Sequence, residues 1–317
     1  MNRAIDIHHH ILPPAYMTAL GSRLGPQGLF GSPPQWSPAI SIEAMDRNGI
    51  GAAITSISAP GVWFGDVPEA CRLARECNEY AAQMKCDFPR RFGLFATLTL
   101  PDVETSLREI DYAFGALAAD GVVLMTNYDG RYPGDEAFRP VFDELNRRKA
   151  IVFFHPTIGP YKNPLAHIPV PSLEFPFDTT RAIVSLLYSG TLARCRDIRF
   201  IFSHAGGAVP FLAQRIARLT ARPEFKQAVP DGVLAELGRL YFDTALSANL
   251  FAFDPMRRLV PVSNILFGSD YPHAGEPTMT ATLKGVDELG LKAGEIGAVR
   301  AGNATVLFPH LVAGAPT

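Results

Sequence analysis

Cysteine is scarce in this sequence. The chain has 317 residues and only 4 cysteines, which are Cys71, Cys77, Cys86 and Cys195. No two of them have the C-x-x-C spacing of a zinc-binding or redox pair, and three fall in one segment expected to be helical. These features exclude a disulfide framework and predict reduced thiols in a cytoplasmic protein.

Long apolar runs and an excess of charge of one sign are also missing. No uninterrupted apolar stretch reaches the ~20 residues that a membrane-spanning helix needs. The first apolar run is short and carries Asp and His, so it is not expected to be a signal peptide. The chain has 29 Lys and Arg against 31 Asp and Glu, with a formal net charge of -2. We therefore expect neither a membrane nor a nucleic acid as a partner.

The phosphate-binding loops of nucleotide-binding folds are absent. There is no G-x-G-x-x-G after the first strand and no G-x-x-x-x-G-K-[ST] anywhere. Short apolar runs alternate instead with helical segments, which is typical of parallel βαβ units. The eight expected strands cover 4–10, 52–57, 92–98, 121–125, 151–154, 199–202, 240–242 and 264–267. We predict a single α/β domain over 1–317, a (β/α)8 TIM barrel, with an open doubly wound sheet as the alternative.

Two stretches rich in proline and glycine interrupt this alternation. Residues 11–40 follow the first expected strand, and residues 156–176 follow the fifth. Both are predicted to be loop insertions over the active face, because long ordered loops in compact domains are usually functional. Helices are expected after them, one from Ser41 as N-cap through Asn48 and one around Thr180–Leu192.

The first expected strand ends in three consecutive histidines. Successive side chains of a strand point to opposite faces, so His8 and His10 share one face and His9 takes the other. Two imidazoles on the same face of a strand can converge on one metal ion. The apolar context argues against a purification tag, while a surface cluster of histidines stays open as the alternative.

Further polar residues lie at or just after the ends of other expected strands. His155 follows 151–154, His204 follows 199–203, and Asp270 follows 264–267. The C-terminal ends of the strands form the active face of TIM-barrel enzymes, so these side chains are expected to meet. Singly, each could be a buried hydrogen-bonding group or, for Asp270, a helix N-cap. Together, three imidazoles and one carboxylate could bind a metal ion and leave one of its coordination positions open for water or substrate, as in a catalytic zinc site.

A lysine is missing after the expected fourth strand. The sequence there is Met125-Thr126-Asn127, whereas binuclear barrel hydrolases place a bridging lysine at this point. We therefore predict one divalent metal ion, zinc with manganese as the alternative. Asp6 and Asp243 are interpreted as structural residues that could hydrogen-bond a metal-binding side chain and so orient it.

Four motifs together resemble the amidohydrolase-related decarboxylases, a family that includes aminocarboxymuconate semialdehyde decarboxylase and 6-methylsalicylate decarboxylase. They are Ile5-Asp6-Ile7-His8-His9-His10-Ile11-Leu12-Pro13, Phe154-His155-Pro156, Phe202-Ser203-His204-Ala205-Gly206-Gly207-Ala208-Val209-Pro210-Phe211, and Phe267-Gly268-Ser269-Asp270-Tyr271-Pro272. They occur in the family's order, and the resemblance runs from residue 5 to Asn303.

The resemblance implies roles for individual residues. His204 matches a histidine that hydrogen-bonds metal-bound water, and His204 and Asp270 become the candidate catalytic residues. Arg215 matches an arginine that reaches the neighbouring subunit's site and holds a substrate carboxylate, which implies a homodimer. Without the resemblance, Arg215 would be interpreted as an exposed helix charge. The metal ligands implied by the resemblance, usually for zinc, are His8, His10, His155 and Asp270.

Two departures from the family narrow the expected substrate. Relatives that act on aminocarboxymuconate semialdehyde carry a second carboxylate-binding arginine where this chain has Leu29–Trp36. His8 argues against the branch that uses Glu at this ligand and takes dihydroxybenzoates. A salicylate-type monocarboxylate is therefore expected. Its candidate contacts are Trp63, Phe64 and His273, although the two aromatic residues could equally be ordinary packing residues.

The function predicted from the sequence is a metal-dependent, non-oxidative decarboxylase of a small aromatic acid resembling 6-methylsalicylate. The principal alternative is a metal-dependent hydrolase of a lactone or amide, because the same four ligands would activate water. A non-catalytic ligand-binding barrel that kept its metal site is a further alternative.

Overall fold

The architecture is known from a computed structural model that describes residues 3–24, 33–160, 165 and 167–311. Within this part of the chain, eight parallel strands pair in chain order, each with the next. The strands are β1 (Ala4–His10), β2 (Ile50–Ser56), β3 (Phe92–Thr97), β4 (Gly121–Met125), β5 (Ile151–His155), β6 (Arg199–Phe202), β7 (Tyr241–Asp243) and β8 (Ile265–Leu266).

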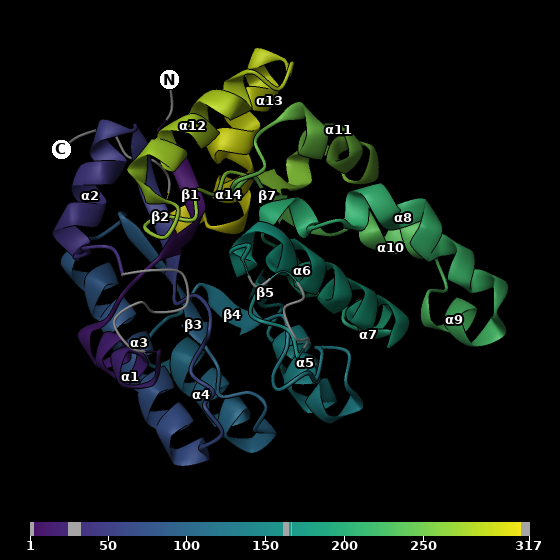
Figure 1. Ribbon diagram of the computed structural model, residues 1–317, viewed down its shortest axis with the longest axis horizontal. Coiled ribbons are helices and arrows are strands. Elements are labelled where there is room, and N and C mark those ends of the chain that lie inside the picture. The colour runs from purple at the N-terminus through teal and green to yellow at the C-terminus, as the bar shows by residue number, and fades with distance from the viewer. Residues whose placement is uncertain (1–2, 25–32, 161–164, 166, 312–317) are drawn as a thin grey trace.

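Helices surround the sheet on the outside (Figure 1). The α-helices are α1 (Pro14–Leu24), α2 (Pro38–Arg47), α3 (Val67–Asp87), α4 (Val103–Gly115), α5 (Arg139–Arg147), α6 (Val170–Tyr188), α7 (Thr191–Arg194), α8 (Val209–Ala217), α9 (Pro223–Ala228), α10 (Val233–Leu237), α11 (Leu250–Leu259), α12 (Gly275–Asp287), α13 (Ala293–Gly297) and α14 (Asn303–Leu307). None of these helices is both long enough and apolar enough to cross a membrane.

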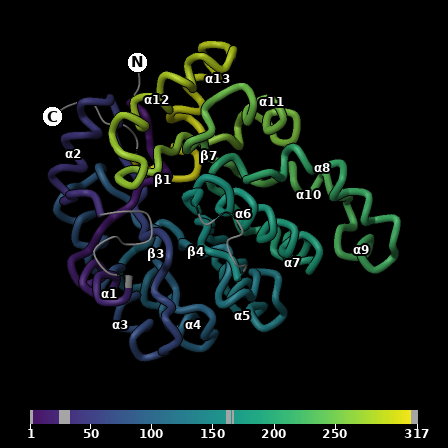
Figure 2. The backbone as a smooth tube through the Cα atoms, in the orientation of Figure 1, coloured from purple at the N-terminus to yellow at the C-terminus, as the bar shows by residue number. Residues whose placement is uncertain are grey.

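Backbone hydrogen bonds between β1 and the segment around β8 complete the ring. Ile7 N–H donates to Phe267 O (3.0 Å), Asp270 N–H donates to His8 O (2.8 Å), and His10 N–H donates to Tyr271 O (2.7 Å). The tube in Figure 2 accordingly runs once around the ring, and its first strand lies beside the C-terminal helices. The predicted (β/α)8 barrel is therefore confirmed.

The interior of the barrel is packed with side chains from the strands. The strand residues are almost all buried, as expected when both faces of a parallel sheet are covered. Inside the barrel, the rings of Phe95 and Phe153 stack with centroids 5.4 Å apart. On the outer face, under the helices, the paired residues Phe154 and Phe202 stack with centroids 4.8 Å apart. This packed core supports the polar residues that sit above it.

The segment 11–40 is more ordered than a loop insertion. It contains α1, and α2 begins at Pro38 with Ser37 as its N-cap, whose hydroxyl accepts a hydrogen bond from Ile40 N–H (3.2 Å). The expected cap at Ser41 is therefore wrong, because proline suits the first helical position and moves the start upstream. Residues 25–32 of the predicted insertion lie outside the described residues.

The helix expected near Thr180 begins ten residues earlier, at Val170. Pro171 lies in the first turn, where a missing N–H costs nothing. Pro176 leaves the carbonyl of Ser172 without its helical donor, and Ser172 is exposed, so water can reach that carbonyl. The predicted loop 156–176 thus ends as a helix, and its residues 161–164 and 166 lie outside the described part.

Helix α11 was not expected from the sequence. Asn249 caps it by accepting a hydrogen bond from Ala252 N–H (3.2 Å), and Pro255 lies inside it. The helix follows the loop after β7 and packs on α8, so this part of the barrel carries an ordered wall where the sequence suggested only a connection.

Helix α12 holds the loop after β7 through a close approach at Gly285. A Cβ added there would lie 2.3 Å from Ala248 O, whereas one added at Gly21 in α1 would have nothing within 4 Å. We predict that Gly285→Ala lowers the free energy of unfolding by ~1–3 kcal/mol through overpacking. Gly21→Ala should raise it by roughly 0.5–1 kcal/mol through helix propensity. Urea unfolding of both variants checks this, and shifts of the same sign would contradict the packing described.

Candidate metal centre and cavity

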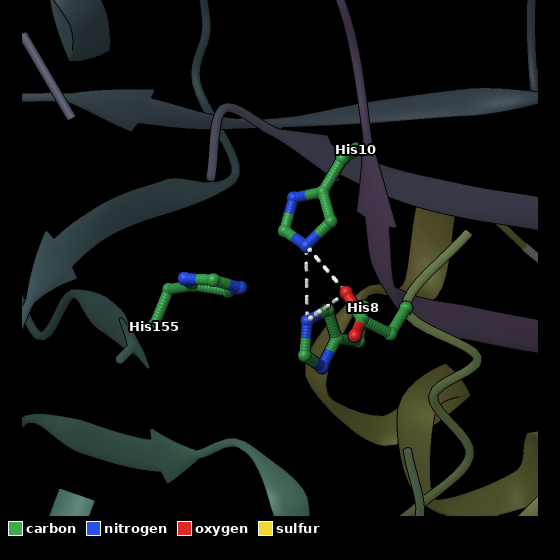
Figure 3. Close-up of side chains that lie close together, drawn as sticks. His8, His10 and His155 are labelled. Carbon is green, nitrogen blue, oxygen red and sulfur yellow. Dashed lines mark hydrogen bonds and ion pairs between the residues drawn. The ribbon is translucent and has the colours of Figure 1, made fainter. Parts of the chain in front are cut away.

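The C-terminal ends of β1 and β5 and the segment after β8 bring four donor side chains together. Nε2 of His8 lies 3.0 Å from Nε2 of His10. Oδ1 of Asp270 lies 3.3 Å from the first and 3.1 Å from the second. With His155, one donor atom from each residue lies within 4.8 Å of all the others. Figure 3 shows His155 approaching His8 and His10 from the opposite wall.

The outer nitrogen of each of these histidines is fixed by an acceptor outside the cluster. Nδ1 of His8 lies 2.6 Å from Asp243 Oδ2, Nδ1 of His10 lies 3.3 Å from Ser56 O, and Nδ1 of His155 lies 2.8 Å from Pro156 O. A protonated Nδ1 donates to these oxygens, which leaves an unprotonated Nε2 on each ring. Metal-binding histidines in proteins are oriented in this way.

Lone pairs and a carboxylate oxygen this close together repel one another unless protons or a metal ion lie between them. Burial opposes a charge on His8, but the Asp243 and Asp270 carboxylates raise its pKa to about 10. Burial lowers the pKa of His10 to about 3 and holds that of His155 well below its usual range. One proton on His8 cannot satisfy three imidazoles. Four donors about 2.1 Å from one ion lie ~3.4 Å apart in a tetrahedron, so these residues fit a single divalent metal.

His9 points away from this cluster, as alternation predicts. Its Nδ1 lies 3.0 Å from Asp6 Oδ2 and its Nε2 lies 2.6 Å from Ser41 Oγ. Asp6 also accepts hydrogen bonds from the backbone N–H groups of His8 (3.1 Å) and Ser269 (3.0 Å). Asp6 is thus a structural residue that fixes the backbone of a ligand-bearing strand.

His204 lies beside the cluster and faces the cavity. Its ring centroid is 5.0 Å from that of His8, and its backbone N–H donates to Asp243 Oδ1 (2.8 Å). Burial lowers the pKa of His204, which keeps its imidazole neutral. His8, His204 and Asp243 also lie within 4.8 Å of one another, but the hydrogen bonds to Asp243 from the ring of His8 and from the backbone of His204 account for that proximity.

A cavity of about 410 Å³ opens above the four donors. His155, His204, Asp270 and His273 line it, so the structure brings the predicted His273 to the site. Residues 171, 172, 175 and 176 of the predicted insertion 156–176 also line it. A cavity of this size holds one small organic ligand.

Trp63, Phe64 and Arg215 do not line this cavity within their own chain. Trp63 donates from Nε1 to Asp129 Oδ2 (2.6 Å), and the Phe64 ring lies under the guanidinium of Arg23, 4.5 Å from its centroid. Arg215 is exposed on α8. Their roles as substrate contacts stay predictions, and the cavity of the single chain gives no support for the two aromatic residues.

Several cavity residues had no signal in the sequence. Ser58 follows β2, Phe175 comes from α6, and Leu246 follows β7. Serine, phenylalanine and leucine are too common for their types to indicate a site. Only the closure of the barrel brings them together.

A closed barrel with three histidines and an aspartate gathered on its C-terminal rim belongs to the class of TIM barrels whose rim can hold a metal ion. The comparison with known families gives the particular one. The family described as Amidohydrolase matches residues 5–309, and the chain belongs to this family.

Two fungal relatives are similar over almost their whole length. The decarboxylase macB of Penicillium terrestre is 36% identical, covering 98% of this chain and 96% of the relative. The 6-methylsalicylic acid decarboxylase acuB of Aspergillus aculeatus is 37% identical, covering 97% and 96%. The resemblance to amidohydrolase-related decarboxylases is thereby confirmed.

Solved structures agree with the fold. A crystal structure of an amidohydrolase II superposes with a TM-score of 0.91 at 28% identity, covering 96% of this chain and 99% of the other. A dihydroxybenzoic acid decarboxylase from Polaromonas, solved with manganese and the inhibitor 2-nitroresorcinol, superposes with a TM-score of 0.78 at 21% identity, covering 98% and 97%.

Adjacent histidines provide a matched test of the metal centre. We predict that His10→Gln lowers metal content and metal affinity by about 100-fold or more, because it removes one of four donors. His9→Gln should retain the metal and lower thermal stability only, because its ring bonds Asp6 and Ser41. Metal analysis after dialysis, with thermal unfolding of both variants, measures this. Equal metal loss in the two variants would remove the distinction between the two faces of β1.

Proposed function

We propose that this protein is a metal-dependent, non-oxidative decarboxylase, a carboxy-lyase acting on a small aromatic acid of the salicylate type. The observation that carries the proposal is a four-donor cluster under a small cavity in a chain 36% and 37% identical, over nearly its full length, to macB and acuB. One of these relatives is named for 6-methylsalicylic acid.

The proposed metal ligands are His8, His10, His155 and Asp270. Three imidazole nitrogens and one carboxylate oxygen suit zinc, and manganese is the alternative, since the Polaromonas decarboxylase carries it. When bound, the metal supplies a Lewis acid and a template for the substrate carboxylate.

The remaining chemistry requires a proton on the ring carbon that loses carbon dioxide. The electron pair of the broken carbon–carbon bond stays on that carbon, so no oxidant or reductant takes part. Two cavity residues are proposed to deliver the proton: His204, as a neutral imidazole, relays it from water in the cavity, or Asp270 donates it from the protonated form that an anionic substrate beside it favours. His204 is neutral and buried, whereas the neighbouring His8 helps to hold the pKa of Asp270 well below its usual range against the effect of burial. A positioned acid of this kind contributes ~10²–10⁴-fold to the rate.

A homodimer is the proposed functional unit. Arg215 lies one helical turn after Phe211 on the exposed side of α8. Phe211 is 82% exposed, and Phe251 on α11, which packs on α8, is 96% exposed. Large exposed aromatic residues mark protein–protein contacts. A second copy covering them would bring its Arg215 toward the cavity mouth, where it would bind a substrate carboxylate.

The proposed location is the cytoplasm. The four cysteines are all free, which suits a reducing compartment.

Carbon dioxide release tests the proposed activity. The metal-loaded protein should decarboxylate 6-methylsalicylate or a related salicylate, and removing the metal with a chelator should abolish turnover until the metal is restored. His204→Asn should lower kcat by ~10²–10⁴-fold if His204 carries the proton. A panel of lactones and amides is the matched comparison. Turnover of that panel with no release of carbon dioxide from any carboxylated aromatic would replace the decarboxylase by the hydrolase.

Subunit mixing tests the role of Arg215. Arg215→Ala should raise KM by roughly tenfold or more, because a charged hydrogen bond is lost, and His155→Gln should abolish activity. When the two variants are mixed and allowed to exchange subunits, one intact site forms in each mixed dimer, so about one quarter of wild-type sites should recover. Recovery of no activity, with mixed dimers shown by mass spectrometry, would mean that Arg215 does not serve the neighbouring site.

A further inference from the structure

The cavity offers a hydrogen-bonding pair beside β1 as well as apolar side chains. Ser58 follows β2 and His273 follows the segment after β8, so both flank β1. Phe175 from α6 and Leu246 from the loop after β7 also line the cavity. A ring held in the cavity can meet hydrogen-bonding groups at Ser58 and His273 and hydrocarbon at Phe175 and Leu246.

Ser58 and His273 form a hydrogen-bonded pair next to the proposed metal centre. Ser58 Oγ lies 2.8 Å from His273 Nε2. Ser58 is buried, with 3% exposure, whereas His273 is exposed in the cavity. The His273 ring centroid lies 5.3 Å from that of His10. The buried hydroxyl therefore holds an accessible imidazole beside a metal ligand, which reduces the entropy lost when a ligand binds.

We propose that Ser58 and His273 form a recognition site for a phenolic hydroxyl on the substrate ring, ortho to the carboxylate. The inference rests on the proposed function for the position of the carboxylate at the metal. The ortho position is the ring position nearest to that carboxylate, and the pair lies beside His10, which is one of the proposed ligands.

The chemistry of the pair favours a hydroxyl over other substituents. The proton between Ser58 Oγ and His273 Nε2 can belong to either atom, so the pair can present a donor or an acceptor. A hydroxyl both donates and accepts, and it is satisfied in either case. A second carboxylate is disfavoured, because no lysine or arginine of the described residues lines the cavity.

A purely structural role for the pair makes a different prediction. Ser58 Oγ also lies 3.4 Å from Ala59 O, so the contact with His273 could serve only to fasten the loop after β2 to the segment after β8. In that case, loss of the pair would lower stability and weaken all ligands equally. Recognition instead predicts a loss that depends on the ligand's hydroxyl.

A pair of ligands that cannot lose carbon dioxide separates these roles. The probes are 2-nitrophenol and nitrobenzene, in which a planar nitro group stands in for the carboxylate and only the first carries the ortho hydroxyl. Their dissociation constants are measured by titration calorimetry on the metal-loaded protein. Wild type should bind 2-nitrophenol about tenfold or more tightly than nitrobenzene, from the hydrogen bonds gained.

Three variants give the readout, with thermal unfolding measured for each. His273→Phe and Ser58→Ala should reduce the preference for 2-nitrophenol to about threefold or less. Ser172→Ala, which removes a hydroxyl from the α6 side of the same cavity, should keep the wild-type preference. Because His273 is exposed, His273→Phe is expected to fold even if Ser58→Ala does not. A preference unchanged in His273→Phe, or absent from wild type, would overturn the proposal.

The measured preference for 2-nitrophenol does not depend on whether the protein turns over a substrate. A protein that shows the hydroxyl preference but releases no carbon dioxide from any salicylate would keep the recognition site and lose the proposed activity. A protein that decarboxylates salicylates but binds both nitro compounds equally would keep the activity and lose the recognition site.

Discussion

The closure of the barrel between β1 and the segment after β8 is the constraint on which the site depends. The hydrogen bonds of this seam involve the backbones of the proposed metal ligands themselves, since Asp270 N–H donates to His8 O and His10 N–H donates to Tyr271 O. Asp270 adopts a positive φ of 63°, which is uncommon for residues other than glycine. These backbone hydrogen bonds hold Asp270 in this conformation. The same bonds that close the barrel therefore set the distances between the donor atoms of His8, His10 and Asp270.

Two fully buried carboxylates secure the seam. Asp6 accepts hydrogen bonds from the backbone of His8 and from the backbone and hydroxyl of Ser269. Asp243 accepts from the His8 ring and from the backbone of His204 and Ala245. A buried carboxylate is tolerated only when its oxygens are hydrogen-bonded. Each carboxylate therefore fixes the elements that donate to it, and both hold His8 in place.

The strands and the rim could be predicted from the sequence, whereas the cavity wall could not. Strands buried on both faces are nearly continuous apolar runs, so His155, His204 and Asp270 stand out as ionisable groups within three residues after them. The family resemblance then separates the proposed ligands from His204. Prolines made the start of α6 look like a loop, although Pro171 suits a first helical turn and water can replace the bond lost at Pro176. Helix α11, which was not predicted, likewise contains a proline, Pro255. The Ser58–His273 contact joins residues 215 positions apart, and no local pattern reports such a contact.

The carboxylate of Asp243 binds two neighbours with different tasks, the ring of His8 through Oδ2 and the backbone of His204 through Oδ1. One buried carboxylate therefore fixes the relative positions of His8, a proposed metal ligand, and His204, the residue proposed to carry the proton. Leu246 and Ala252, which also line the cavity, make none of these hydrogen bonds to Asp243. Evolution can therefore exchange wall residues to admit new rings while the reactive apparatus keeps its alignment.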